Sequence, residues 1–281
     1  MQIFKQIAPL KAFLRSTKCQ GKSIGLVPTM GALHEGHLAL FKTSKNENDI
    51  TVGSIFVNPV QFNDPTDLAK YPRNFEKDVE LLEAAGCDVL FSPENVEMYP
   101  AKATLSMDFG NLDKVMEGYF RPGHFSGVAL VVSKLFNIVE PDQAYFGQKD
   151  WQQYAIIRRL VEDLNFDIRL HSVATMREED GLAMSSRNAR LSSEDRAKAN
   201  VFFKGLLAGK SAFKAGASVK SARKKVRETV EVFPDVSLEY FELADSTNLN
   251  LLENVEQSER PIMCIAGYVG EVRLIDNMFL D

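Results

Sequence analysis

The chain has 281 residues, of which 45% are hydrophobic and 25% charged, and its formal net charge at pH 7 is −5. This composition is typical of a globular protein with a full hydrophobic core, and the length favours one large and one small domain. The acidic balance argues against general nucleic-acid binding, and no window is apolar enough to span a membrane.

Three cysteines, Cys19, Cys87 and Cys264, are widely spaced and form no CxxC pair. They indicate a reducing, cytoplasmic location and not a disulfide framework. The segment from Met1 to Arg15 is an amphipathic mixture without an apolar stretch of signal-peptide length.

From residue 24 to about 175, short apolar segments alternate with segments of helical period. We predict strands at 24–27, 51–57, 88–91, 143–146 and 166–174, and helices at 37–45, 75–85, 126–139 and 150–164. Asn74 is a suitable N-cap for the second helix, and Gly86 a suitable end. The alternation predicts an α/β domain with a parallel sheet covered on both faces, which binds ligands at the carboxyl ends of its strands.

The pattern changes near residue 176. Ala, Lys and Ser dominate residues 192–232, which we interpret as two helices separated near Gly216. Strands are predicted at 239–244, 261–268 and 272–277. The chain is therefore expected to divide into a first domain of residues 1–175 and a smaller α+β domain of residues 176–281, which could close over the first as a lid.

The most informative segment follows the first predicted strand and reads Met30-Gly31-Ala32-Leu33-His34-Glu35-Gly36-His37. His34 and His37 are three residues apart at a helix start, so their imidazoles can project together. The N–H groups and the positive dipole end of the helix also point there, which predicts a phosphate site.

Three alternatives compete for this segment. The zinc helix of metalloproteases has His-Glu-x-x-His, a different spacing, and only His124 and His171 remain as further ligands. The glycines match neither a dinucleotide fingerprint nor a Walker loop. On local grounds the histidines could also be exposed at an ordinary helix start.

Further candidates follow later strands. Asn58 and Gln61 offer uncharged amides suited to hydroxyl and carboxylate groups, although an exposed Asn-Pro turn is equally compatible. Tyr71 leads into the helix that carries Asp78, a carboxylate that could meet magnesium or only solvate a helix face. In a later glycine-punctuated loop, Arg121 and His124 would be phosphate or carboxylate partners, or part of a capped helix start.

Gly147-Gln148-Lys149-Asp150 forms the predicted turn between the strand at 143–146 and the start of the helix at 150–164. Lys149 would be a phosphate cation, and Gln153 would face the same cleft one turn later, while Asp150 could simply cap the helix. Met184-Ser185-Ser186-Arg187 is interpreted either as a phosphate-gripping loop or as a plain interdomain linker.

Together these segments resemble the pantoate–β-alanine ligase family, whose superfamily shares a HIGH-type motif with class I aminoacyl-tRNA synthetases. The resemblance is close from about residue 21 to 196 and looser beyond. The motifs that carry it are Pro28–His37, Val57–Phe62, Tyr71–Arg73, Arg121–Phe125, Gly147–Asp150 and Met184–Asn188.

The resemblance implies a Rossmann-like, doubly wound sheet, a smaller C-terminal domain, a homodimer, and ATP-dependent condensation of (R)-pantoate with β-alanine, giving pantothenate, AMP and pyrophosphate. It implies ATP binding by residues 30–37, 147–150 and 184–187 together with Met176. Pantoate would be held by Gln61 and Gln153, with Asn58, Tyr71, Arg121 and His124 as further substrate contacts. His37 would be catalytic, and His34, Lys149, Arg187 and Mg²⁺ would stabilise phosphate charge.

Two other functions stay open at this point. One is an adenylyltransferase that acts on a phosphate ester, which would need more cations than the two glutamines provide. The other is a regulatory module that binds ATP without turning it over. A tRNA synthetase is disfavoured because no anticodon-binding extension fits after residue 196.

Overall fold

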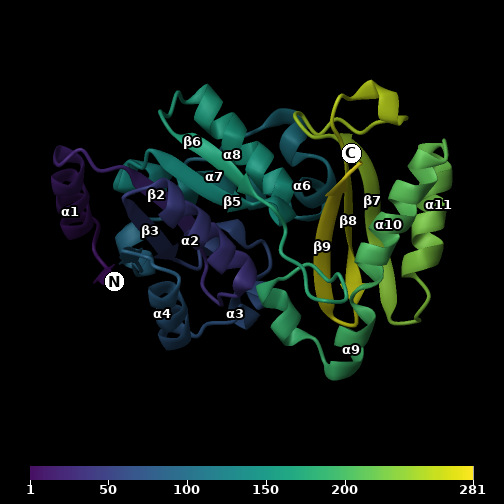
Figure 1. The fold of residues 1–281 in the computed structure, drawn as a ribbon, viewed down its shortest axis with the longest axis horizontal. Coiled ribbons are helices and arrows are strands. Elements are labelled where there is room, and N and C mark those ends of the chain that lie inside the picture. The colour runs from purple at the N-terminus through teal and green to yellow at the C-terminus, as the bar shows by residue number, and fades with distance from the viewer. Residues whose placement is uncertain (281) are drawn as a thin grey trace. The chain divides into compact units, whose positions relative to one another are not determined.

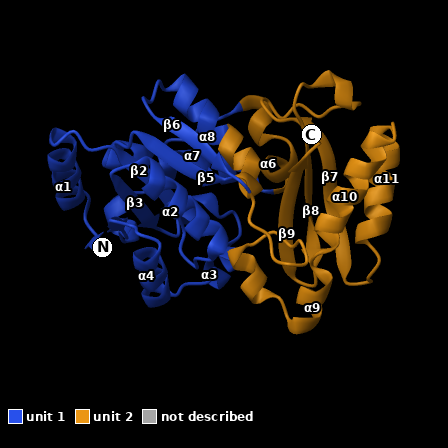
Figure 2. Ribbon diagram, viewed as in Figure 1, with its two compact units in different colours: residues 1–109, 121–147, 156–174 blue, residues 110–120, 148–155, 175–281 orange. Residues whose placement is uncertain are grey.

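The computed structural model describes residues 1–280, which divide into two compact units (Figure 2). Unit 1 comprises residues 1–109, 121–147 and 156–174, and unit 2 comprises residues 110–120, 148–155 and 175–281. The last segment of unit 2 begins at residue 175. Unit 2 is discontinuous in sequence, because two short segments, 110–120 and 148–155, precede its main part.

Unit 1 is built on a six-stranded parallel sheet in the order β1-β4-β3-β2-β5-β6 (Figure 1). Its strands are β1 (Gln2–Phe4), β2 (Ile24–Thr29), β3 (Ile50–Ile55), β4 (Val89–Phe91), β5 (Gln143–Gly147) and β6 (Arg169–Val173). The chain leaves β2 through β3 toward β4 and later returns to β5 on the other side of β2. This order confirms the predicted doubly wound sheet, and its switch point lies between β2 and β5.

Helices flank this sheet and complete the core of unit 1. They are α1 (Ile7–Cys19), α2 (Glu35–Glu47), α3 (Pro65–Lys70), α4 (Phe75–Ala84), α5 (Asn95–Met98), α7 (His124–Val139) and the later part of α8 (Trp151–Asp163). Helix α2 packs on β2 and β3, and its buried Leu40 and Phe41 share a hydrophobic cluster with Val27 of β2. Helix α7 is apolar over almost all of its surface and is correspondingly buried.

Unit 2 contains the antiparallel sheet β7 (Val236–Asp245), β8 (Pro261–Val269) and β9 (Val272–Phe279), in that order. Its helices are α6 (Met116–Phe120), α9 (Ser193–Lys198), α10 (Val201–Lys214) and α11 (Val219–Val230). The expected two helices in residues 192–232 are three, because Ser192 caps the additional helix α9 and that helix ends at Lys198. Gly216 separates α10 from α11 as predicted.

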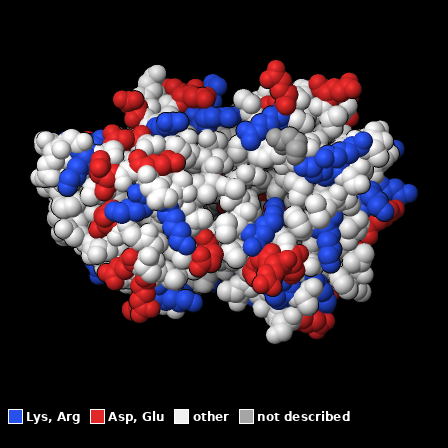
Figure 3. Space-filling view, viewed as in Figure 1, with Lys and Arg blue, Asp and Glu red and all other residues white. Residues whose placement is uncertain are grey.

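Among residues 1–280, no helix combines the length and apolarity needed to cross a membrane. On the face shown in Figure 3, acidic and basic side chains are interspersed, in keeping with the small net charge.

Candidate active site

The turn between β2 and α2 carries the histidine motif and has an unusual backbone. Gly31 and Ala32 have φ angles of 80° and 51°, in the left-handed region that glycine tolerates and alanine seldom adopts. The Thr29 hydroxyl donates to the Ser54 carbonyl at 2.6 Å and accepts from the Gly31 amide at 3.2 Å. These contacts hold the first half of the turn against the end of β3.

Asp78 of α4 holds the second half. Its buried carboxylate accepts from the Ala32 amide at 2.8 Å and from the Leu33 amide at 2.7 Å. A Cβ on Gly31 would lie 2.9 Å from Asp78 Oδ2, so glycine permits this close approach. Both carboxylate oxygens accept from backbone amides, so Asp78 anchors the turn. Because the side chain is buried, the alternative that it only solvates a helix face is wrong.

The two imidazoles adjoin at the N-terminus of α2. His34 is the N-cap, and its Nδ1 accepts from the Gly36 amide at 3.1 Å. That contact leaves Nε2 as the protonated ring nitrogen of His34. The His37 ring lies one turn further, with a centroid distance of 4.1 Å to His34. The two imidazoles therefore lie together at the helix start.

Asn58 and Gln61 form a buried amide cluster after β3. Asn58 Nδ2 donates to Gln61 Oε1 at 3.1 Å and to the Gly127 carbonyl at 3.0 Å, and Asn58 Oδ1 accepts from the Tyr99 hydroxyl at 2.9 Å. Burial raises the pKa of Tyr99 to about 12, so this hydroxyl remains a donor at neutral pH. Gln61 Nε2 lies 3.2 Å from the Met30 sulfur, which connects the amides to the histidine motif.

His124 contacts the backbone of Gln61, and Arg121 contacts His124. His124 is buried, with Nδ1 2.8 Å from the Gln61 carbonyl and Nε2 3.2 Å from Arg121 Nη1. In α7, a Cβ on Gly127 would lie 2.6 Å from the Val60 carbonyl, so only glycine allows the helix to approach this turn. The structure thus gives His124 a backbone contact through which it orients Gln61.

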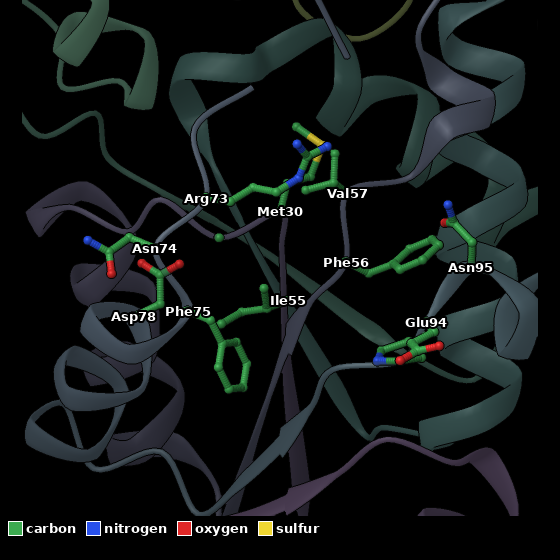
Figure 4. A pocket seen from close by; sticks show the side chains of 12 residues that line it. Met30, Ile55, Phe56, Val57, Arg73, Asn74, Phe75, Asp78, Glu94 and Asn95 are labelled. Carbon is green, nitrogen blue, oxygen red and sulfur yellow. The ribbon is translucent and has the colours of Figure 1, made fainter. Parts of the chain in front are cut away.

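A pocket of about 320 Å³ lies beside the histidine turn in unit 1 (Figure 4). Its lining consists of Met30, Gly31, Ile55, Phe56, Val57, Arg73, Asn74, Phe75, Asp78, Pro93, Glu94 and Asn95. Figure 4 shows Met30, Val57 and Arg73 gathered on one side, while Asp78 and Asn74 lie on another. Tyr71 is buried, with its ring 6.0 Å from that of Phe62.

Unit 2 carries the second group of predicted residues. Gln148–Asp150 forms a 3-10 turn directly before α8, and Lys149 Nζ lies 4.0 Å from the Asp150 carboxylate. The Lys149 side chain is only 15% exposed. A partly buried cation beside the positive end of a helix favours an anionic ligand. Gln153 lies one turn further along α8 and is half-buried.

Residues 176–184 form a small hairpin in unit 2. Arg177 and Ala183 pair as an antiparallel bridge, and the Met184 amide donates to the Met176 carbonyl at 2.9 Å. Ser185 then caps the 3-10 turn Ser186–Arg190, with its Oγ accepting from the Arg187 amide at 3.3 Å. The segment is therefore a hydrogen-bonded hairpin followed by a capped turn.

Comparison with known proteins identifies the family. A family model described as Pantoate-beta-alanine ligase matches residues 2–279. The chain belongs to the pantoate–β-alanine ligase family. Pantothenate synthetase from Bacteroides fragilis is 49% identical over 278 residues, 99% of this chain and 98% of that protein. The Aquifex aeolicus pantothenate synthetase is 49% identical over 277 residues, covering 98% and 97%.

Solved structures of pantoate–β-alanine ligases share the fold. Pantothenate synthetase from Thermus thermophilus superposes with a TM-score of 0.93 at 42% identity, over 100% of this chain and 99% of that one. The Francisella tularensis ligase, described as complexed with beta-gamma ATP and beta-alanine, has a TM-score of 0.84 at 36% identity, covering 100% and 98%. The family resemblance predicted from six motifs is confirmed, and the chain is an ATP-dependent ligase of pantoate and β-alanine.

Three supporting residues were missed by the sequence prediction. Tyr99 and Gly127 hold Asn58, and Asn277 of β9 contacts the turn that contains Lys149. Each lies 41 or more residues from its partner in the chain, so no local spacing indicates the contact.

Proposed function

We propose that the ligation runs in two steps through a pantoyl adenylate. The supporting observation is that His34 and His37 adjoin at the start of α2 and are connected through Met30 to the amide cluster. Ring and backbone N–H donors at a helix N-terminus suit phosphate. Uncharged amides suit a hydroxy acid whose carboxylate must remain a nucleophile.

In the first step, a carboxylate oxygen of pantoate attacks the α-phosphorus of ATP, and the bond to pyrophosphate breaks. A carboxylate needs no general base, so the protein must align the reactants and stabilise phosphate charge. We assign that task to His37, His34, Lys149 and Arg187. The remaining ATP contacts are assigned to residues 30–37, 147–150, 176 and 184–187.

In the second step, the uncharged amine of β-alanine attacks the acyl carbon, the bond to AMP breaks, and the amine releases a proton. Gln61 and Gln153 are proposed to hold pantoate, with Asn58 and Tyr71 nearby. Arg121 and His124 would act on the substrate through the Gln61 backbone.

Magnesium is proposed to accompany the triphosphate. Within residues 1–280, no group of three or more His, Cys, Asp or Glu side chains is arranged to hold a metal ion. Mg²⁺ commonly binds through substrate phosphates, waters and one or two carboxylates, which fits this site. The metal would neutralise phosphate charge when bound.

The family resemblance supports a homodimer, and the spaced, free cysteines support a cytoplasmic location.

Exchange of labelled pyrophosphate into ATP tests the first step. The purified chain should catalyse exchange when pantoate is present, without β-alanine. Nicotinate mononucleotide and phosphopantetheine should not replace pantoate. Folded protein that forms pantothenate yet shows no exchange would refute the adenylate, whereas exchange with a phosphate ester would favour the alternative acceptor class.

A further inference from the structure

Strand β9 contacts the Lys149 turn from within unit 2. Asn277 Nδ2 donates to the Gln148 carbonyl and to the Lys149 carbonyl, at 2.8 Å each. A single amide group therefore fixes the backbone of the turn that presents the Lys149 ammonium.

The preceding residue of β9 holds the 176–184 hairpin. Arg177 donates from Nη1 and Nη2 to the two Asp276 oxygens at 2.6 Å and 3.0 Å, a two-point pairing with defined geometry. Arg177 Nη1 also donates to the Gly181 carbonyl at 3.0 Å, and the guanidinium lies 4.5 Å from the centre of the Phe203 ring. Arg177 thereby joins the first arm and the loop of the hairpin to β9.

We infer that Asp276 and Asn277 are positioning residues for the adenylation step, because they hold the Lys149 turn and the hairpin before Ser185 in one fixed arrangement. Successive side chains of a strand point to opposite faces, so two adjacent residues can reach two separate segments. The inference rests on the proposed ATP-binding roles of Lys149 and of Met184–Arg187. It predicts that substitutions of Asp276 or Asn277 weaken ATP binding, although neither residue needs to contact the nucleotide.

Stability alone does not explain this pair of residues. Burial raises the pKa of Asp276 even though Arg177 lies beside it. Asn277 Oδ1 is buried and has no hydrogen-bond partner among the described residues. Apolar replacements of buried ion pairs are often neutral or stabilising, so the two polar side chains are better explained by the segments they position.

Calorimetric titration with ATP tests the inference on three variants and a matched control. Asn277→Leu removes the amide donors at similar size, and Asp276→Asn removes the charge opposite Arg177. Arg177→Lys keeps a cation beside Asp276 but loses the two-point geometry, so it serves if the others fold poorly. The control Glu239→Gln changes another carboxylate of the same sheet, which pairs with Arg273 of β9 away from both segments.

We expect the dissociation constant for ATP to rise about tenfold or more in the three variants, and the KM for β-alanine to stay within about twofold. Glu239→Gln should keep the wild-type ATP affinity, whatever its urea stability. Unchanged ATP affinity in folded Asn277→Leu and Arg177→Lys would overturn the inference, as would an equal loss in the control. A wild-type chain that binds no ATP would instead refute the proposed ATP segments themselves.

Discussion

Asp78 shows how a single side chain can set the geometry of a catalytic motif that it does not belong to. The left-handed φ angles of Gly31 and Ala32 are unfavourable for an alanine and persist only where neighbouring contacts impose them. Asp78 supplies those contacts by accepting from two consecutive amides. The direction in which α2 starts, and with it the placement of His34 and His37, depends on this carboxylate.

Replacing Asp78 by asparagine should therefore impair catalysis more than folding. Asparagine keeps one acceptor oxygen and turns an N–H donor toward the second amide, so we expect a loss of about 1–3 kcal/mol in unfolding free energy. Misplaced imidazoles should lower kcat/KM about a hundredfold. Urea unfolding and pyrophosphate exchange measure the two effects.

The control is Asp142→Asn, because Asp142 accepts from the Ile24 amide at 2.7 Å where β2 begins, away from the histidine turn. This variant should lose stability without the loss of activity. A similar drop in exchange for both variants would contradict the role given to Asp78.

At the scale of elements, the 176–184 hairpin is held at two points. Arg177 joins it to β9, and Arg196 of α9 donates to both oxygens of Asp180 at 2.7 Å and 3.2 Å. Hydrogen bonding to Arg196 holds the pKa of Asp180 below its ordinary value of 3.8. A short hairpin with few buried side chains of its own depends on such contacts for order.

Asp180→Asn should remove the contribution of the Asp180–Arg196 pair to the unfolding free energy, and that contribution should depend on pH. With a lowered folded pKa, the Asp180 contribution is complete above pH 3.8 and is lost as the pH falls through the folded pKa. Both side chains are about one-third exposed, so the unfolding free energies of wild type and variant should differ by no more than about 1 kcal/mol at neutral pH. Urea unfolding should show this difference at neutral pH and a smaller one at strongly acidic pH. A larger difference in acid would contradict the stabilising role of the Asp180 carboxylate.

The elements that the sequence predicted well have local residues that mark where they begin or end. Asn74 caps α4 as expected, and each predicted strand of the parallel sheet is present. Strand β1, with three residues, is too short to show a period, and α1 begins at Ile7 after Gln6, which provides no side-chain cap, so neither was predicted. The role of Asp78 could not be predicted because it depends on amides 45 and 46 residues away.

At the scale of the whole chain, the discontinuity of unit 2 has a definite chemical basis. Gln152 Nε2 donates to the Leu112 carbonyl at 2.7 Å, which ties two of the inserted segments together. Arg273 of β9 pairs with Glu117 from the inserted segment and with Glu239 of β7. All three charged side chains are at most 17% exposed, so the cluster joins residues 110–120 to the sheet through a buried cation.

Arg273→Met should therefore destabilise the protein far more than loss of an ordinary arginine. It leaves two carboxylates buried near each other without their cation, a change that typically costs about 3–5 kcal/mol. The matched control is Arg223→Met, which removes an arginine that is 44% exposed and paired with Glu242 of β7. That pair should contribute no more than about 1 kcal/mol, because solvent screens it. Urea unfolding of both variants gives the comparison, and equal midpoints would mean that residues 110–120 are held to the sheet by contacts other than Arg273.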